Sequence, residues 1–123
     1  MTRRFAYDGT KSPAAPILPI KIRAAGGKTA AAEGIVDTGS DVSVLPARLA
    51  KDLRLLVVGE VAVHGVTGSA RVKLYTTEME IDGVTVTVEA VGMGTHTLIG
   101  RDVINRWTVV LRGPQQMLEL EVD

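Results

Sequence analysis

The sequence is distinguished first by the residues that it lacks. None of its 123 residues is cysteine, which excludes a disulfide scaffold and a zinc site built from thiolates. It has only two histidines, His64 and His96, so we predict no histidine metal cluster and no cofactor. No apolar run approaches the length of a membrane span, and Met1–Thr10 lacks the apolar core of a signal peptide. We therefore expect a soluble, cytoplasmic protein without a membrane segment.

Net charge is also absent, because 14 lysines and arginines balance 14 aspartates and glutamates. The charges are scattered, and the longest basic run is Arg3-Arg4, so nucleic acid is not a predicted partner. The length suits one domain with a hydrophobic core. We assign residues 17–123 to this domain. Residues 1–16 are rich in charged, small and proline residues, and we expect them to form a flexible N-terminal arm.

The spacing of apolar residues and glycines in the rest of the sequence predicts short strands separated by glycine-rich turns. Two short helices are expected, one at Pro46–Leu53 that packs loosely at the surface and one after Gly100. The expected strands are an edge strand at 17–23 containing Pro19, its return strand at 28–36 after Gly26-Gly27, a long hairpin between Leu55 and Ile81, a return strand from Val84 after Asp82-Gly83, and a final hairpin from Thr108 to Val122. This order predicts an all-β fold, a closed or sandwiched barrel without βαβ units.

One stretch combines a buried strand with reactive side chains. The β-branched pair Ile35-Val36 leads directly into Asp37-Thr38-Gly39-Ser40-Asp41, whose composition favours a turn. A carboxylate at that junction is either satisfied locally, as in an Asx-type turn, or used chemically, and the triplet alone does not decide. A serine nucleophile at Ser40 or Ser43 is not favoured, because both histidines lie in glycine-rich loops away from a triad pattern.

A second motif, Leu98-Ile99-Gly100-Arg101-Asp102, follows about sixty residues later and opens a short helix. With the Asp37 motif before it and the glycine-bounded tip Gly65-Val66-Thr67-Gly68 between them, the chain resembles the retropepsin-like aspartic proteases, the single-domain family that includes the retroviral proteases. The resemblance implies a small closed barrel of the acid-protease type, with one lobe per chain. It also implies a homodimer, because each chain supplies one Asp-Thr-Gly and the catalytic pair needs two.

The resemblance further implies roles for individual residues. Asp37, Thr38 and Gly39 correspond to the catalytic triplet, and the hydroxyl of Thr38 would reach across the dimer. Ser40, Asp41 and Arg101 correspond to supporting residues, with Asp41 and Arg101 as an ion pair between the catalytic turn and the helix behind it. The residues implied in substrate binding are Gly39, Asp41, Val42, the flap tip Gly65, Val66, Thr67 and Gly68, and Met93.

The implied function is an aspartic endopeptidase that cleaves peptides or proteins between apolar residues through a water activated by two Asp37 carboxylates. Ser40 stands where pepsins commonly have serine, and a hydroxyl donor to the carboxylate would favour its charged form, so we expect an acidic optimum. The long C-terminal hairpin predicts a dimer interface in which Met117–Val122 pairs across the two-fold axis. The competing interpretation is a non-catalytic dimeric peptide-binding module that retains the protease fold.

Overall fold

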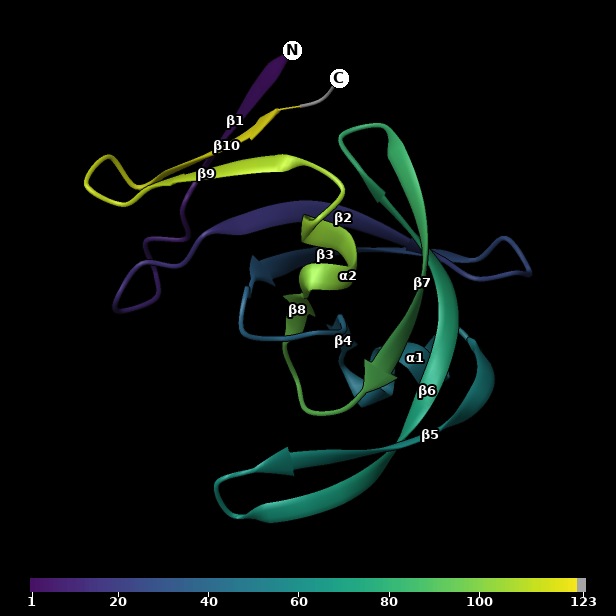
Figure 1. Ribbon diagram of the computed structural model, residues 1–123. Coiled ribbons are helices and arrows are strands. Elements are labelled where there is room, and N and C mark those ends of the chain that lie inside the picture. Colours follow the sequence, from purple (N-terminus) through teal and green to yellow (C-terminus); the bar gives the residue numbers. More distant parts are fainter. Residues whose placement is uncertain (122–123) are drawn as a thin grey trace.

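The computed structural model describes residues 1–121. This part of the chain contains ten strands and two short helices (Figure 1). The all-β class predicted from the sequence is confirmed. In chain order the elements are β1 (Thr2–Ala6), β2 (Ile17–Arg23), β3 (Thr29–Val36), β4 (Val44–Leu45), α1 (Ala47–Asp52), β5 (Leu56–Gly65), β6 (Gly68–Ile81), β7 (Val84–Gly92), β8 (Thr97–Ile99), α2 (Arg101–Ile104), β9 (Thr108–Arg112) and β10 (Met117–Glu121).

The larger sheet closes into a barrel. Its seven strands run in the order β2-β3-β8-β4-β7-β6-β5, and a further pairing of β2 with β6 joins six of them into a ring. Side chains alternate along these strands, so β2 buries Leu18, Ile20 and Ile22 while Pro19 and Lys21 face outward. The prediction of an edge strand holds only for the half that contains Pro19, because Lys21–Arg23 pairs with β3 on one side and β6 on the other.

The hairpins predicted from glycine-rich turns are confirmed. Asp82 and Gly83 both have positive φ, 51° and 81°, as a type I′ turn between β6 and β7 requires. Gly65 pairs with Gly68 at the tip of the β5–β6 hairpin. The helix α1 also forms as predicted, but it does not pack loosely at the surface: Ala50 and Leu53 are buried in the hydrophobic core.

A second sheet of three strands, in the order β1-β10-β9, lies over one end of the barrel (Figure 1). The prediction of a flexible arm is therefore wrong for Thr2–Ala6, which pairs with Met117–Glu121 along its whole length. Phe5 packs against the core, and Asp8 pairs with Ala15 to close the loop that follows. Composition missed this strand because its partner lies at the opposite end of the sequence.

The strand β10 occupies the middle of this second sheet. It pairs with β1 on one side and with β9 on the other, and its inward side chains Leu118 and Leu120 are fully buried. The expectation that Met117–Val122 pairs across a two-fold axis is thus wrong for Met117–Glu121, whose two edges are already taken, while Val122 lies outside the described residues. Within residues 1–121, no helix has the length and apolar character needed to cross a membrane.

Candidate active site

Asp37 lies where β3 leaves the barrel, and its backbone is fixed by the neighbouring strand. Its N–H donates to the carbonyl oxygen of Ile99 at 2.9 Å, at the end of β8. One side-chain oxygen, Oδ1, accepts the N–H of Gly39 at 3.0 Å, which is the Asx-type turn considered from the sequence. The other oxygen, Oδ2, accepts no hydrogen bond from residues 1–121, and Asp37 is half-buried. The turn therefore holds the carboxylate in place while leaving one oxygen available.

The helix α2 holds this turn from behind through Arg101. The side chain of Arg101 donates from Nη1 to the carbonyl oxygen of Thr38 at 2.8 Å. The backbone N–H of Arg101 donates to the carbonyl oxygen of Ser40, also at 2.8 Å. The predicted ion pair between Asp41 and Arg101 is wrong: the guanidinium reaches the backbone of Thr38, and Asp41 forms no ion pair within the described chain. Arg101 still connects the turn to the helix, but it does so through a main-chain carbonyl.

Ser40 also differs from its predicted role as a donor to the catalytic carboxylate. Its hydroxyl donates to the carbonyl oxygen of Val42, two residues further along the loop. Its carbonyl oxygen accepts the N–H of Arg101. Ser40 therefore shapes the loop after Asp37 and makes no hydrogen bond to the carboxylate with its side chain.

A buried polar link between Ser43 and Asp102 was not identified from the sequence. Ser43 is fully buried and donates twice to Asp102, from its N–H to Oδ2 at 3.0 Å and from its hydroxyl to Oδ1 at 2.8 Å. The same hydroxyl accepts the N–H of Gly100 at 3.0 Å. The signal in the sequence that could have indicated this network is a serine between two valines, Val42 and Val44.

Gly100 allows the two motifs to approach each other closely. Its backbone is extended, so the glycine is not required by its φ angle. A Cβ at this position would lie 2.6 Å from the backbone carbon and oxygen of Val42 and 2.9 Å from the carbonyl oxygen of Ser40. Only a residue without a side chain lets β8 and the loop after Asp37 pack at this distance.

A cavity of about 450 Å³ lies between the loop after Asp37 and the β5–β6 hairpin. It is lined by Ser40, Asp41, Val42, Val44, Val61, Ala62, Val63, His64, Leu74, Glu89, Val91 and Met93. The structure thus brings Asp41, Val42 and Met93 together in one cavity. Asp37, Thr38 and Gly39 stand beside it and do not line it.

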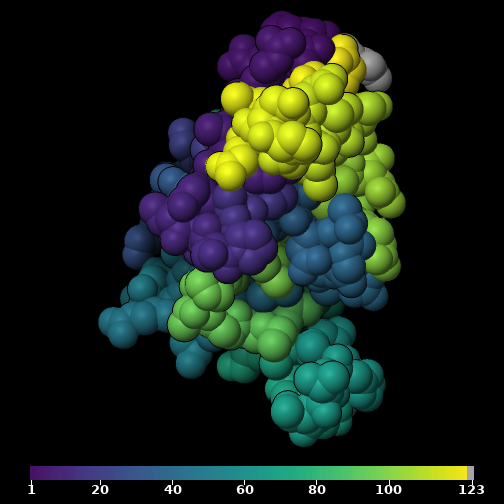
Figure 2. Space-filling view, turned by 90° about the vertical axis from the view of Figure 1, so that its left-hand side faces the viewer, coloured from purple at the N-terminus to yellow at the C-terminus, as the bar shows by residue number. Residues whose placement is uncertain are grey.

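The predicted flap tip, Gly65 to Gly68, does not line the cavity either. It projects from the body of the protein as the teal protrusion at the bottom of Figure 2, and Val66 at its end is completely exposed. The strand β5 behind the tip forms one cavity wall through Val61, Ala62 and Val63. No group of three or more histidine, aspartate or glutamate side chains suited to a metal ion occurs among residues 1–121.

Comparison with known proteins decides the family. The family model described as retroviral aspartyl protease matches residues 12–112, a span that includes both motifs. The chain belongs to the retroviral aspartyl protease family. No curated protein matches it, so the comparison with individual proteins depends on solved structures.

Several solved structures of retropepsins share the fold. A retropepsin-like aspartic protease from Rickettsia conorii has a TM-score of 0.64 and 14% identity, covering 98% of this chain and 90% of that one. EIAV protease, in complex with the inhibitor HBY-793, has a TM-score of 0.62 and 19% identity, covering 75% of this chain and 86% of its own. The protease of simian foamy virus (mac) has a TM-score of 0.56 and 14% identity, covering 73% and 92%. At these identities the likeness shows the fold alone.

Proposed function

We propose that this retropepsin-like protein is an aspartic endopeptidase that acts as a homodimer. The observation that carries the proposal is the state of Asp37: one carboxylate per chain, held by the Gly39 amide at Oδ1, with Oδ2 left without a partner in residues 1–121. A single carboxylate cannot both accept a proton from water and donate one to the substrate in the same step. A second copy of the chain would supply the missing group.

The reaction requires the two Asp37 carboxyls to share one proton, because two adjacent carboxylates repel each other when both are charged. The ionised Asp37 would take a proton from a water molecule as that water attacks the scissile carbonyl carbon. The protonated Asp37 would give its proton to the carbonyl oxygen, forming a tetrahedral diol. Transfer of a proton to the amide nitrogen then breaks the C–N bond. One proton must be present on the pair, so we expect the rate to be highest at acidic pH.

The substrate we infer is an extended peptide with apolar residues on either side of the cleaved bond. Eight of the side chains that line the cavity beside Asp37 are apolar: Val42, Val44, Val61, Ala62, Val63, Leu74, Val91 and Met93. Backbone amides of the flap tip, Gly65 to Gly68, would close over the peptide and exclude water. Main-chain hydrogen bonds would provide affinity and the apolar cavity selectivity.

Cleavage of a mixed peptide library, at acidic and neutral pH, tests the proposal. We expect the wild-type chain to cleave between apolar residues and Asp37→Asn to be inactive, because an amide cannot take the proton from water. Asp52→Asn is the matched control, since this exposed carboxylate lies in α1 and makes only a surface ion pair with Arg48.

Three outcomes would count against the proposal. Equal cleavage by the wild type and Asp37→Asn would exclude the carboxylate mechanism. Peptide binding by a dimer without any cleavage would favour the non-catalytic module. Sedimentation at the assay concentration tests the two-chain site, which an active protein that is entirely monomeric would contradict.

A further inference from the structure

The cavity beside the loop after Asp37 is not uniformly apolar. Beside its eight apolar side chains it is lined by Ser40, Asp41, His64 and Glu89. Two of these four carry carboxylates, and no lysine or arginine of residues 1–121 lines the cavity. His64 is its one lining side chain in the described chain that can become positively charged. An apolar wall is therefore combined with an excess of acidic groups.

The two carboxylates lie toward the same end of this cavity. Glu89 and Val91 are two residues apart in β7, so their side chains lie on the same face of the sheet. The strand β4 runs parallel to β7 and sets Val44 beside Val91. Asp41 precedes Val44 in the chain, and Glu89 precedes Val91. Because the two strands are parallel, both acidic residues precede the paired valines on the same side.

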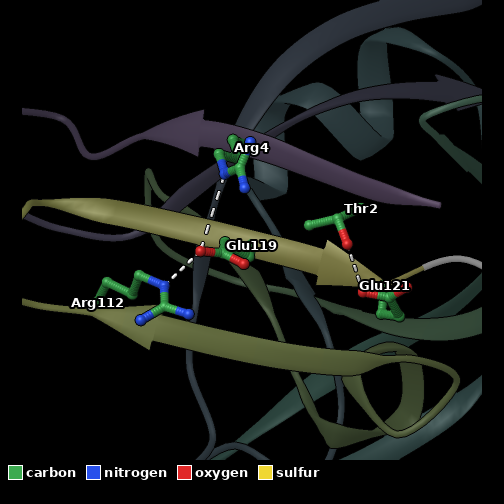
Figure 3. A network of polar contacts seen from close by, with 5 residues as sticks. All are labelled: Thr2, Arg4, Arg112, Glu119 and Glu121. Atoms are coloured by element: carbon green, nitrogen blue, oxygen red, sulfur yellow. Dashed lines mark hydrogen bonds and ion pairs between the residues drawn. The ribbon is translucent and has the colours of Figure 1, made fainter.

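Neither carboxylate is satisfied within the protein. In residues 1–121, Asp41 and Glu89 form no ion pair and accept no hydrogen bond with their side chains. The second sheet provides the contrast, since Figure 3 shows Glu119 of β10 between Arg4 and Arg112. Asp41 and Glu89 therefore keep their full capacity to bind a cationic group from another molecule.

A lysine or arginine side chain has the two properties that match this cavity. Its stem of methylene groups packs against apolar surface, whereas its charged head stays at the edge in contact with water and carboxylates. Asp41 and Glu89 are both exposed, so they stand on the solvent side of the apolar wall, where such a head would emerge. An apolar side chain would cover the wall and leave both carboxylates without a partner.

We propose that this cavity selects a lysine or arginine of the substrate peptide, and that Glu89 recognises its charge together with Asp41. The inference rests on the proposed function, because it narrows the substrate class of that same site. Asp37 does not line the cavity, so the basic residue need not be one of the two residues that flank the cleaved bond. Apolar residues at the bond and a basic residue further along the peptide are compatible.

The first test compares lysine with norleucine, which has the same straight carbon chain without the amino group. A peptide that the wild-type chain cleaves is made with lysine, norleucine or glutamate at each position near the bond in turn. The assay is run at about pH 6, where side-chain carboxyls in general are ionised. At one position we expect kcat/KM for lysine to exceed that for norleucine about two- to fivefold, as suits an exposed ion pair. Glutamate should be the poorest of the three there.

Variants of Glu89 assign this preference to its charge. Glu89→Gln should bring the ratio of lysine to norleucine toward one and leave cleavage of the norleucine peptide unchanged. Glu89→Lys should invert the preference, so that the glutamate peptide is cleaved faster than the lysine peptide. The matched control is Glu33→Gln, an exposed glutamate of β3 outside the cavity, which should keep the wild-type ratio. A purely structural role of Glu89 would change cleavage of all three peptides alike.

The second test measures binding without cleavage. Asp37→Asn leaves every residue that lines the cavity in place, so this variant reports on recognition alone. Fluorescence anisotropy of the labelled lysine and norleucine peptides gives their Kd values. We expect the lysine peptide to bind about two- to fivefold more tightly, and Glu89→Gln in the same background to reduce that difference.

The outcomes separate this proposal from the proposed function. Cleavage with equal kcat/KM for lysine and norleucine at every position would overturn the basic preference and leave the protease intact. A protein that cleaves nothing but binds the lysine peptide more tightly through Glu89 would overturn the protease and support the recognition site. Absence of cleavage together with equal binding, or with no binding, would overturn both. If the Glu89 variants do not fold, as judged by circular dichroism, the comparison of lysine with norleucine on the wild type decides alone.

Discussion

Ser43 and Asp102, which are 59 residues apart in the sequence, are joined by two hydrogen bonds, from the serine N–H at 3.0 Å and from its hydroxyl at 2.8 Å. Ser43 lies in the loop that follows Asp37, and Asp102 lies in the first turn of α2. The pair therefore joins the two sequence motifs through side chains, in addition to the backbone contacts of β3 with β8. Together with the hydrogen bonds of Arg101, it connects the loop after Asp37 to α2.

Asp102→Ala should destabilise the protein by about 2–3 kcal/mol, because it removes a charged acceptor and leaves the buried N–H and hydroxyl of Ser43 without that partner. We also expect peptide cleavage to fall, since the loop after Asp37 loses its attachment to α2. Denaturant unfolding measures the first effect. Asp52→Ala, which breaks only the exposed Arg48–Asp52 pair, should cost less than about 0.5 kcal/mol. A similar loss in both variants would contradict the role of the link.

Gly100→Ala should destabilise the fold by about 1–3 kcal/mol and displace the loop after Asp37, because the added methyl group meets the backbone of Val42 at 2.6 Å. Backbone cannot move aside as a flexible side chain can. Gly113→Ala is the matched control: nothing lies within 4 Å of a Cβ there, so its unfolding midpoint should be unchanged. Equal stability of the two variants would show that the close approach is not required.

Ser40→Ala should leave the shape of the pH–rate profile unchanged. The Ser40 hydroxyl bonds to the Val42 carbonyl oxygen and not to Asp37, so its removal does not alter the hydrogen bonds of the carboxylate. The expected cost is about 0.5–1.5 kcal/mol of stability from the lost hydrogen bond. The measurement is kcat/KM as a function of pH, and a shifted acidic limb in the variant would restore the role first inferred from the sequence.

Asp8 gives the protein a pH-dependent contribution to stability. The hydroxyl of Thr10 at 2.6 Å and its N–H at 2.9 Å, with a smaller effect of Lys11, lower the pKa of Asp8 below its usual 3.8. A carboxyl with a lowered pKa in the folded state stabilises that state above its unfolded pKa, and this stabilisation is lost as the pH falls through the folded value. Thr10→Val should therefore flatten the fall in unfolding free energy below about pH 4. A slope identical to that of the wild type would contradict this assignment.

Much of the fold follows from local sequence signals. The turn Asp82-Gly83 predicted a hairpin because few residue pairs accept two positive φ angles, and both are observed. The strand at Ile17–Arg23 and the helix after Gly100 also form where the pattern placed them. These features depend on neighbours within a few residues, which a sequence displays directly.

Features that depend on distant partners could not be predicted in this way. Thr2–Ala6 looks unstructured because its composition does not indicate that Met117–Glu121 offers it a strand edge. The directions of the Ser40 and Arg101 side chains likewise depend on which carbonyl oxygens the folded loop presents to them. The motifs located the candidate site, but the contacts that support it became visible only in three dimensions.

The second sheet, formed by β1, β10 and β9, has a consequence for how the activity of the protein would be controlled. Since β1, β9 and β10 all come from one chain, each protomer completes this sheet without borrowing strands. Under the proposed two-chain site, a dilute protomer would be folded but inert, and the association of two folded chains would complete the site. At low concentration the amount of the proposed dimer would rise with the square of the protein concentration. The concentration of the protein would thus determine how much of it is active.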